Sequence, residues 1–104
     1  SVDLSIKIYR ITNTFPEHEK FGLTNQLRRA GVSLPSNIAE GSKRTTKKDF
    51  KHFLTIASGS GAEIETQLYI AQQLGYLTKE EYSTAQEDIT EVMKMITSLI
   101  KKFE

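Results

Sequence analysis

The feature that most constrains the fold of this sequence is a run of apolar and small residues that recurs at alternating intervals of four and three positions. The run consists of Phe50, Leu54, Ala57, Gly61, Ile64, Leu68 and Ala71. Alternation of four and three places all of these residues on one face of an α-helix. A β-strand would require a period of two. The sequence therefore predicts a long amphipathic helix in this region.

Residues that are typical of helix starts and helix ends set the limits of this helix. Thr46, followed three residues later by Asp49, is typical of a helix start, because a threonine hydroxyl accepts a hydrogen bond from the backbone N–H three residues on. Gly75 is typical of a helix end, where the backbone often adopts a left-handed conformation. We expect the third helix between these two points, after a loop over Gly41–Thr45.

A fourth helix follows almost at once. Thr78-Lys79-Glu80-Glu81 forms a complete capping box, and Leu77 with Tyr82 supplies the hydrophobic staple across it. The apolar face then continues to the end of the chain through Tyr82, Ala85, Ile89, Val92, Ile96, Leu99 and Phe103. Met93 and Ile100 lie beside this seam and widen it, which favours a second buried contact such as another subunit.

Two earlier segments have the same periodicity. Val2–Phe15 has apolar residues at helical spacing, and Pro16 ends it. Its pattern is already established at Val2 with no capping residue before it, so we expect this helix to begin before the first residue of the sequence. A second stripe comprises Leu23, Leu27, Ala30, Leu34, Ile38 and Gly41.

Proline interrupts the second stripe without breaking its register. The spacing stays at three or four across Pro35, which favours one helix kinked at Pro35; the alternative is a true break at Ser33. Because proline has no N–H, the carbonyl of Gly31 lacks its helical partner. Ser33 and Ser36 are candidates to supply local hydrogen bonds there.

Short connections between long helices force neighbours to be antiparallel, so we predict an all-α, up-down-up-down four-helix bundle in a single domain, 1–104. A two-helix coiled coil is disfavoured by the same short loops. The chain has no cysteine, so neither disulfides nor thiolate metal sites hold it together. No run approaches a membrane span or a signal peptide, and we expect a cytoplasmic protein with no membrane contact.

Charge is distributed unevenly. The net charge is +1, yet residues 1–62 hold ten Lys or Arg and five acids, whereas residues 63–104 hold four and eight. One interpretation is simply a set of solvated helix faces. The other is a binding surface, because most of the cations cluster in sequence. The candidate nucleic-acid or partner-binding residues are Arg28, Arg29, Lys43, Arg44, Lys47, Lys48 and Lys51.

This cluster fits a phosphate backbone, whose affinity for a basic surface falls as salt rises. No aromatic residues alternate with the lysines, which argues against stacking of bases from single strands. Sequence-specific readout is therefore not predicted. Shape or backbone binding is the function that these residues support.

Other candidate sites each have a structural explanation. Ser58-Gly59-Ser60-Gly61 resembles a phosphate loop, but it lacks the preceding strand and the lysine, so close approach of the second helix at Gly61 is favoured. Asn37, Glu40 and Arg44, with Ser60, are expected to form a polar network that fixes the kinked helix.

Catalysis and metal binding are weakly supported. Glu40 and Glu63 would be a general acid and base only with a nucleophile or a third group beside them, and none is evident. His18 and His52 belong to no ligand pair, so we predict no metal, no cofactor and no enzymatic activity.

Several motifs together resemble one family. They are Phe15-Pro16, Phe21-Gly22-Leu23, Gln26–Ala30, Ser33–Gly41, Phe53-Leu54, Ile56-Ala57 and Gly59-Ser60, with Glu19 and Glu63. The chain resembles, over nearly its whole length, the bacterial four-helix bundle proteins encoded within intervening sequences of 23S rRNA genes. The run Asn37-Ile38-Ala39-Glu40-Gly41 is the most specific part. The accessory variability determinant proteins of diversity-generating retroelements are similar in fold.

The resemblance implies a ring-shaped homopentamer without enzymatic activity. In the retroelement branch it implies binding of a reverse transcriptase and of RNA or DNA through basic surfaces. Pro35, Asn37, Glu40 and Gly41 match motif positions, whereas Gly61 stands where the family usually has a larger apolar residue. The remaining alternative is a purely protein–protein assembly scaffold without nucleic-acid binding.

Overall fold

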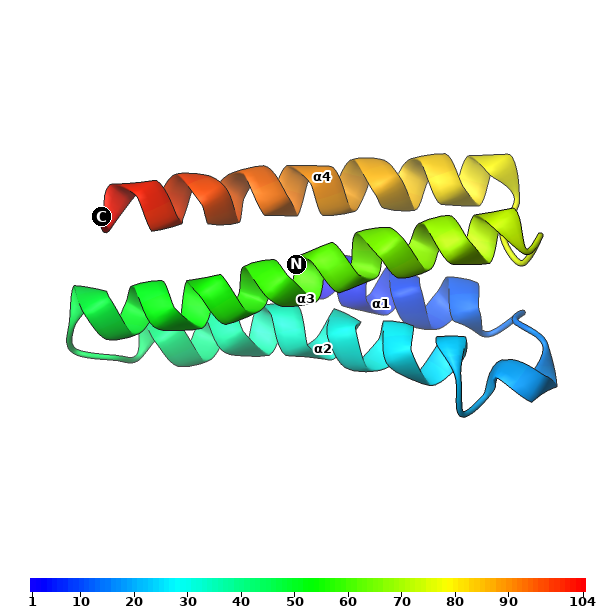
Figure 1. Cartoon of the computed structure of the whole chain (residues 1–104), viewed down its shortest axis with the longest axis horizontal. Coiled ribbons are helices and arrows are strands. Elements are labelled where there is room, and N and C mark those ends of the chain that lie inside the picture. Colours follow the sequence, from blue (N-terminus) through cyan, green and yellow to red (C-terminus); the bar gives the residue numbers. More distant parts are fainter.

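The computed structural model describes all residues from Ser1 to Glu104 and confirms the all-α four-helix bundle. The helices are α1 (Val2–Thr12), α2 (Leu23–Ser42), α3 (Lys47–Gln73) and α4 (Lys79–Lys102), with a short 3₁₀ helix, η1 (Glu17–Glu19), before α2. Consecutive helices run in opposite directions (Figure 1). No stretch of these helices combines the length and the hydropathy that a membrane span requires.

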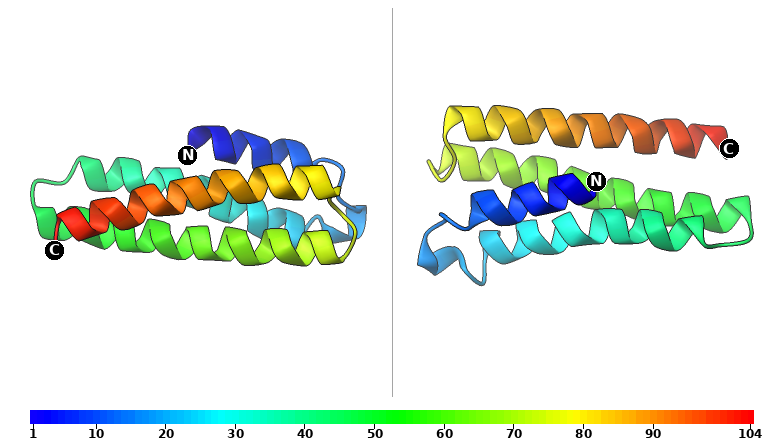
Figure 2. Two further views of the ribbon diagram at one scale, coloured as in Figure 1. Left: turned by 90° about the horizontal axis from the view of Figure 1, so that it is seen from above. Right: turned by 180° about the vertical axis from the view of Figure 1, so that it is seen from behind.

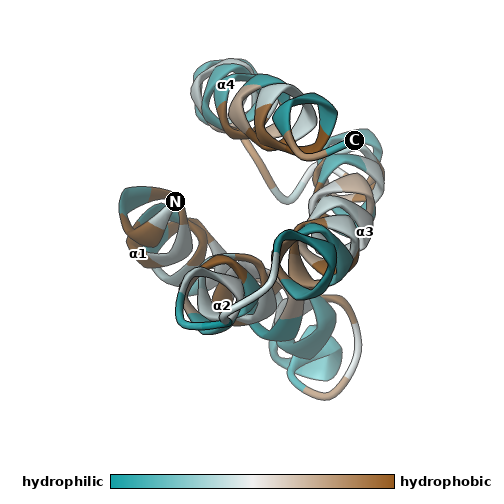
Figure 3. Cartoon of the chain, turned by 90° about the vertical axis from the view of Figure 1, so that its left-hand side faces the viewer, coloured by the Kyte–Doolittle hydropathy of each residue, from teal (hydrophilic) through white to brown (hydrophobic).

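The bundle is elongated, with extents of 43 × 23 × 18 Å. α1 is the shortest of the four helices and lies alongside one half of α2 only (Figure 2). Seen end-on, the four helices form an arc in chain order, and α1 faces α4 across its open side (Figure 3). The two ends of the bundle therefore differ in how many helices build them.

The core consists of the stripes that the sequence predicts. Each of the four helices contributes at least one fully buried large side chain, and these are Ile8, Leu27, Leu34, Leu54, Ile64, Leu68, Ile89 and Ile96. Removing one such side chain from water stabilises the fold by about 1.5–3 kcal/mol. Because there are no disulfides to assist, this burial is the main force that holds the helices together.

The predicted limits agree with the structure at the starts of α3 and α4, but the predicted loop over Gly41–Thr45 is too long, because Gly41 and Ser42 still belong to α2. The Thr46 hydroxyl accepts from the N–H of Asp49, and Thr78 forms the complete capping box. Gly75 has φ +79°, the left-handed conformation expected at a helix end. α1 ends at Thr12 rather than at Phe15, which lies buried beyond the helix. Proline disfavours helical backbone in the residue before it, here Phe15, so the helix stops before Pro16.

α2 continues through Pro35 as one helix, so the alternative of a break at Ser33 is wrong. The carbonyl of Gly31, which loses its helical donor, accepts a hydrogen bond from the hydroxyl of Ser5 in α1. The compensation therefore comes from a neighbouring helix and not from Ser33 or Ser36. This contact also fixes α1 against the middle of α2.

Two glycines mark close packing between helices. A Cβ on Gly41 would lie 2.8 Å from the Cβ of Phe53 and 2.9 Å from Cδ1 of Phe50, so a side chain there would push α2 away from α3. A Cβ on Gly61 would collide with the side chain of Met93 in α4. The prediction that Gly61 admits the second helix is therefore wrong, because its partner is α4.

Met93 fills the space above Gly61, and Ile100 packs against the core. Both side chains thus take part in packing within the single chain and stay only partly buried, and their role in a contact with another subunit stays a prediction. Gly59 is different, since a Cβ there would meet nothing within 4 Å. A glycine in an exposed helix interior costs about 1 kcal/mol relative to alanine, and nothing within the single chain explains it.

The contact between Ser5 and Gly31 can be tested by a double-mutant cycle. Ser5→Ala should lower the free energy of unfolding by about 1–2 kcal/mol, because it leaves a partly buried carbonyl without a donor. In a Pro35→Ala background the new backbone N–H can donate to that carbonyl, so the same change should cost about 0.5 kcal/mol or less. Urea unfolding of the four proteins measures both costs.

Ser36→Ala, at an exposed position of α2, serves as the matched control and should change stability little. Equal costs of Ser5→Ala in the two backgrounds would show that the hydroxyl does not replace the missing helical donor.

Candidate nucleic-acid interface

The α2–α3 connection carries the densest group of cations. α2 ends at Ser42 and α3 begins at Lys47, so Lys43 and Arg44 lie in the tight loop between them. Lys47 and Lys51, one helical turn apart, share one face of α3. All of the cations of this segment are exposed except Lys51, which is half-buried. The structure therefore brings these predicted residues together at one end of the bundle.

Two lysines join this group from a distant part of the sequence. The Phe50 and Phe103 rings pack with their centroids 4.9 Å apart, which holds the last turn of α4 beside the first turn of α3. Lys101 and Lys102 in that last turn are exposed. The sequence analysis missed them, although antiparallel pairing of α3 and α4 was enough to predict that the end of one lies beside the start of the other.

We call this surface the basic end. It combines residues from the α2–α3 loop, the first turns of α3 and the last turn of α4: Lys43, Arg44, Lys47, Lys48, Lys51, Lys101 and Lys102. The acids in the same segments are Glu40, Asp49 and Glu104. Cations thus outnumber acids there by more than two to one, and the N-terminal dipole of α3 adds positive potential.

Arg44 is the most constrained cation of the basic end. Its guanidinium donates to the carboxylate of Glu40 at 2.6 Å and lies 4.8 Å from the ring centroid of Phe53. Both charged side chains are about half exposed, so the ion pair contributes little stability. Arg44 is therefore positioned but partly neutralised, and the free cations are the lysines.

The predicted polar network divides into two. Glu40 pairs with Arg44 on the surface, whereas Asn37 donates to the carbonyl and the hydroxyl of Ser33 within α2. The Ser60 hydroxyl on α3 bonds to Ser33 at 3.0 Å, which ties the two helices together. The expectation of one network is wrong because Glu40 points to solvent. It lies in an exposed ion pair and not in a buried acid–base pair.

Arg28 and Arg29 do not belong to the basic end. They precede Lys43 by fourteen or fifteen residues of the same helix, which corresponds to about 21–22 Å at a rise of about 1.5 Å per residue. Arg28 donates to the hydroxyl of Thr12 at 2.9 Å and to the carbonyl of Tyr9, and stacks on the ring of Tyr9. Arg28 therefore donates hydrogen bonds to the C-terminal end of α1.

Arg29 lines a separate polar cleft between α2 and α3. The cleft has a volume of about 410 Å³ and also contains Ser33, Ser60 and Glu63. Glu63 offsets the charge of Arg29 there. The two arginines predicted with the lysines are thus structural or local. The rise of a continuous helix from Arg29 to Lys43 already implies their separation, and the sequence analysis overlooked it.

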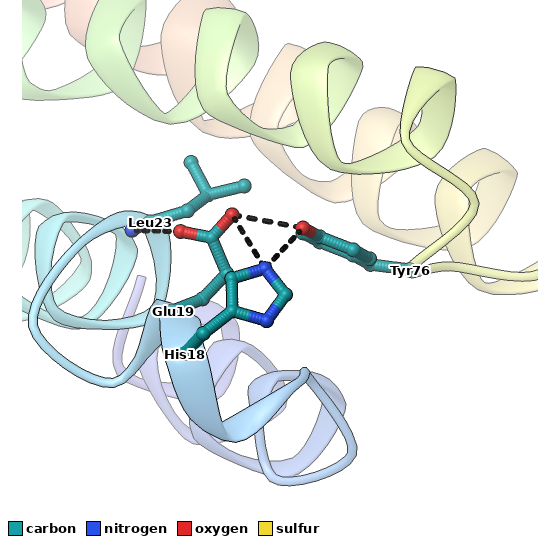
Figure 4. A network of polar contacts seen from close by, with 4 residues as sticks. All are labelled: His18, Glu19, Leu23 and Tyr76. Atoms are coloured by element: carbon teal, nitrogen blue, oxygen red, sulfur yellow. Dashed lines mark hydrogen bonds and ion pairs between the residues drawn. The ribbon is translucent and has the colours of Figure 1, made fainter.

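Two titratable groups with shifted pKa values, Glu19 and Tyr76, lie at the opposite end of the bundle (Figure 4). Glu19 accepts from the N–H of Leu23 at 3.2 Å and from the hydroxyl of Tyr76 at 2.8 Å. These bonds, in that order, lower the pKa of Glu19 below its ordinary value. The bond to Glu19 is the largest cause that raises the pKa of Tyr76. Glu19 therefore caps the first turn of α2 and ties it to the α3–α4 connection.

His18 lies at the edge of the same cluster, with Nε2 3.3 Å from the Tyr76 hydroxyl. His52 packs edge-on against Phe53 in α3. The structure holds no group of three or more His, Cys, Asp or Glu side chains that could bind a metal ion.

Comparisons with known proteins identify similar chains. A family model described as 23S rRNA-intervening sequence protein matches residues 1–98. The chain is similar to a crystal structure of a protein of unknown function from the S23 ribosomal protein family of Bacteroides thetaiotaomicron VPI-5482. The two share 31% identity over 96% of this chain and 97% of that chain, with a TM-score of 0.82. No curated protein matches the sequence.

The hydrogen bonds that Glu19 accepts from Leu23 and Tyr76 predict that the stability of the fold depends on pH. Its pKa in the folded chain lies below the ordinary value of 4.5, so its contribution is full above that value and is lost as the pH falls through the folded pKa. Glu19→Gln should therefore reduce the melting temperature at neutral pH and flatten its fall toward about pH 3.

Melting curves followed by circular dichroism measure this effect. Glu17→Gln, a neighbouring exposed position, is the control and should keep the pH dependence of the unchanged protein. An unaltered acid transition in Glu19→Gln would contradict the assignment of the cap.

Proposed function

Because the chain belongs to the family of 23S rRNA-intervening sequence proteins, we propose that it is a non-enzymatic module that assembles with itself and binds nucleic acid, or a nucleic-acid-processing protein, through the basic end. The single observation that carries this proposal is the gathering of lysines from the α2–α3 loop and two helices on one end of the bundle.

The basic end suits a phosphate backbone better than bases. Its lysines are exposed except for the half-buried Lys51, and each is a point charge that positions a phosphate without reading sequence. The neighbouring rings are engaged within the fold, since Phe50 packs on Phe103 and Phe53 lies under Arg44. They are therefore not free to stack on bases, and the proposed binding is shape-directed and sensitive to salt.

A protein partner with an acidic surface would use the same lysines. In the retroelement branch that the sequence resembles, the protein partner is a reverse transcriptase. With either kind of partner, we propose that the protein acts in the cytoplasm. Binding to RNA or DNA is the form of the proposal that is tested first, because it needs no identified protein.

Self-assembly into a homopentamer is proposed from the resemblance and from the outer face of α3. Ile56, Gly59, Glu63 and Ile70 follow one another at helical spacing on this face, and the two isoleucines are exposed to 40% and 42%. The unexplained Gly59 would admit a second helix at close range. These features also support the alternative function, a protein–protein scaffold without nucleic-acid binding.

Charge reversal tests the binding of nucleic acid. The unchanged protein should bind a double-stranded RNA or DNA at about 50 mM salt and lose roughly a hundredfold in affinity by about 200 mM, as expected for about four phosphate contacts. Lys47→Glu with Lys51→Glu should lower the salt slope by about 2. Fluorescence anisotropy with a labelled duplex measures both.

The control is Lys20→Glu with Lys79→Glu, the same charge change at exposed positions of the opposite end. Absence of binding by the unchanged protein at low salt refutes nucleic-acid binding. Binding that both double variants weaken equally would assign the effect to net charge and not to the basic end.

Light scattering tests the assembly. We expect a mass of five chains at micromolar concentration and a monomer for Gly59→Arg, because an arginine at an open helix position disturbs an interface without touching the core. Glu87→Arg on α4 is the control and should leave the assembly intact. A monomeric unchanged protein would exclude the ring, and a pentamer that survives Gly59→Arg would move the interface away from α3.

A further inference from the structure

A groove runs between α1 and α4, the two helices that face each other across the open side of the arc (Figure 3). Two cavities follow one another along it, with volumes of about 670 and 630 Å³. The first lies between the end of α1 and the start of α4, and the second between the start of α1 and the middle of α4. The ion pair between Lys7 and Asp88 crosses the groove where they meet.

The floor of the groove contains apolar side chains that the bundle does not cover. Ile6 on α1 is 47% exposed and Met95 on α4 is 44% exposed. Ile11, which is buried, and Val92, which is partly buried, complete the apolar lining of the two cavities. The lining of α4 extends from Glu80 to Met95, which corresponds to about 22 Å, or four helical turns.

The rim of the groove is acidic. It includes the carboxylates of Asp3, Glu80, Glu81, Asp88 and Glu91, against the cations of Lys7 and Arg10. Lys7 is already paired with Asp88. The groove therefore favours an occupant that has an apolar stripe with positive charges beside it.

We propose that the groove between α1 and α4 is the docking site of a basic amphipathic helix from a protein partner. One wall is about three turns of α1 and the other about four turns of α4, and together they accept a helix whose apolar residues recur at three and four positions. The side chains of the Lys7–Asp88 ion pair that crosses the groove are 34% and 36% exposed, so a docked helix lies over this pair or displaces it.

A second copy of this chain does not supply such a helix. Its most basic segment is the start of α3, and the apolar residues of that segment are engaged in its own bundle, where Leu54 is fully buried and Phe50 packs on Phe103. The segment cannot offer its apolar stripe to a neighbour while it stays folded. The proposal is independent of the function proposed for the basic end.

A labelled peptide of about 18 residues, with leucines on one helical face and lysines elsewhere, is the probe. Fluorescence anisotropy should show binding to the whole protein. Glu80→Lys with Glu91→Lys should weaken it by about tenfold at low salt, and Ile6→Ser should weaken it at all salt concentrations. Lys47→Glu with Lys51→Glu should leave it unchanged, which separates this result from that of the basic end.

Glu17→Lys with Glu87→Lys, an equal charge change at exposed positions outside the two cavities, is the matched control and should bind the peptide like the unchanged protein. Circular dichroism establishes that each variant is folded. The proposal is overturned if a scrambled peptide of the same composition binds equally well, or if the two double lysine variants lose affinity equally. It is also overturned if Ile6→Arg dissociates a self-assembled form, because a second copy would then occupy the groove.

Discussion

The close packing of α2 against the start of α3 is the constraint on which the rest of the structure depends. It is possible because Gly41 has no side chain to hold the rings of Phe50 and Phe53 away from the α2 backbone. The two helices can then be joined by a loop of only a few residues. That loop, and the first turns of α3, carry the lysines of the basic end, so a packing requirement in the core determines where the surface charge is displayed.

The same pair of helices explains why the most specific motif of the sequence is structural. Asn37 and Ser60 both bond to Ser33, and the carbonyl freed by Pro35 is satisfied from α1. Each of these polar groups has a partner inside the fold. The motif thus specifies how α1, α2 and α3 meet, while the exposed segments around it remain available for binding.

Periodicity and capping residues were sufficient to predict the four helices, because both are local properties of the chain. Thr46, Gly75 and Thr78 occupy the positions expected of them. Partners across the bundle were not predictable in the same way. The sequence shows that Gly61 faces inward, but the register between α3 and α4 decides that Met93 fills its space. For the candidate site, the lysines of one loop were predicted correctly as neighbours, whereas Arg28 is engaged at the end of α1 and Lys101 joins from the last turn of α4.

The contact between Phe50 and Phe103 links the charge of the basic end to a helix terminus. Terminal turns open locally at little cost in free energy, and when the last turn of α4 opens, Lys101 and Lys102 leave the surface that the other five cations form. The electrostatic potential at this end is therefore coupled to a local folding equilibrium. A polyanion bound across both helices would hold that turn closed, and the protection of its backbone amides from hydrogen exchange would rise with occupancy.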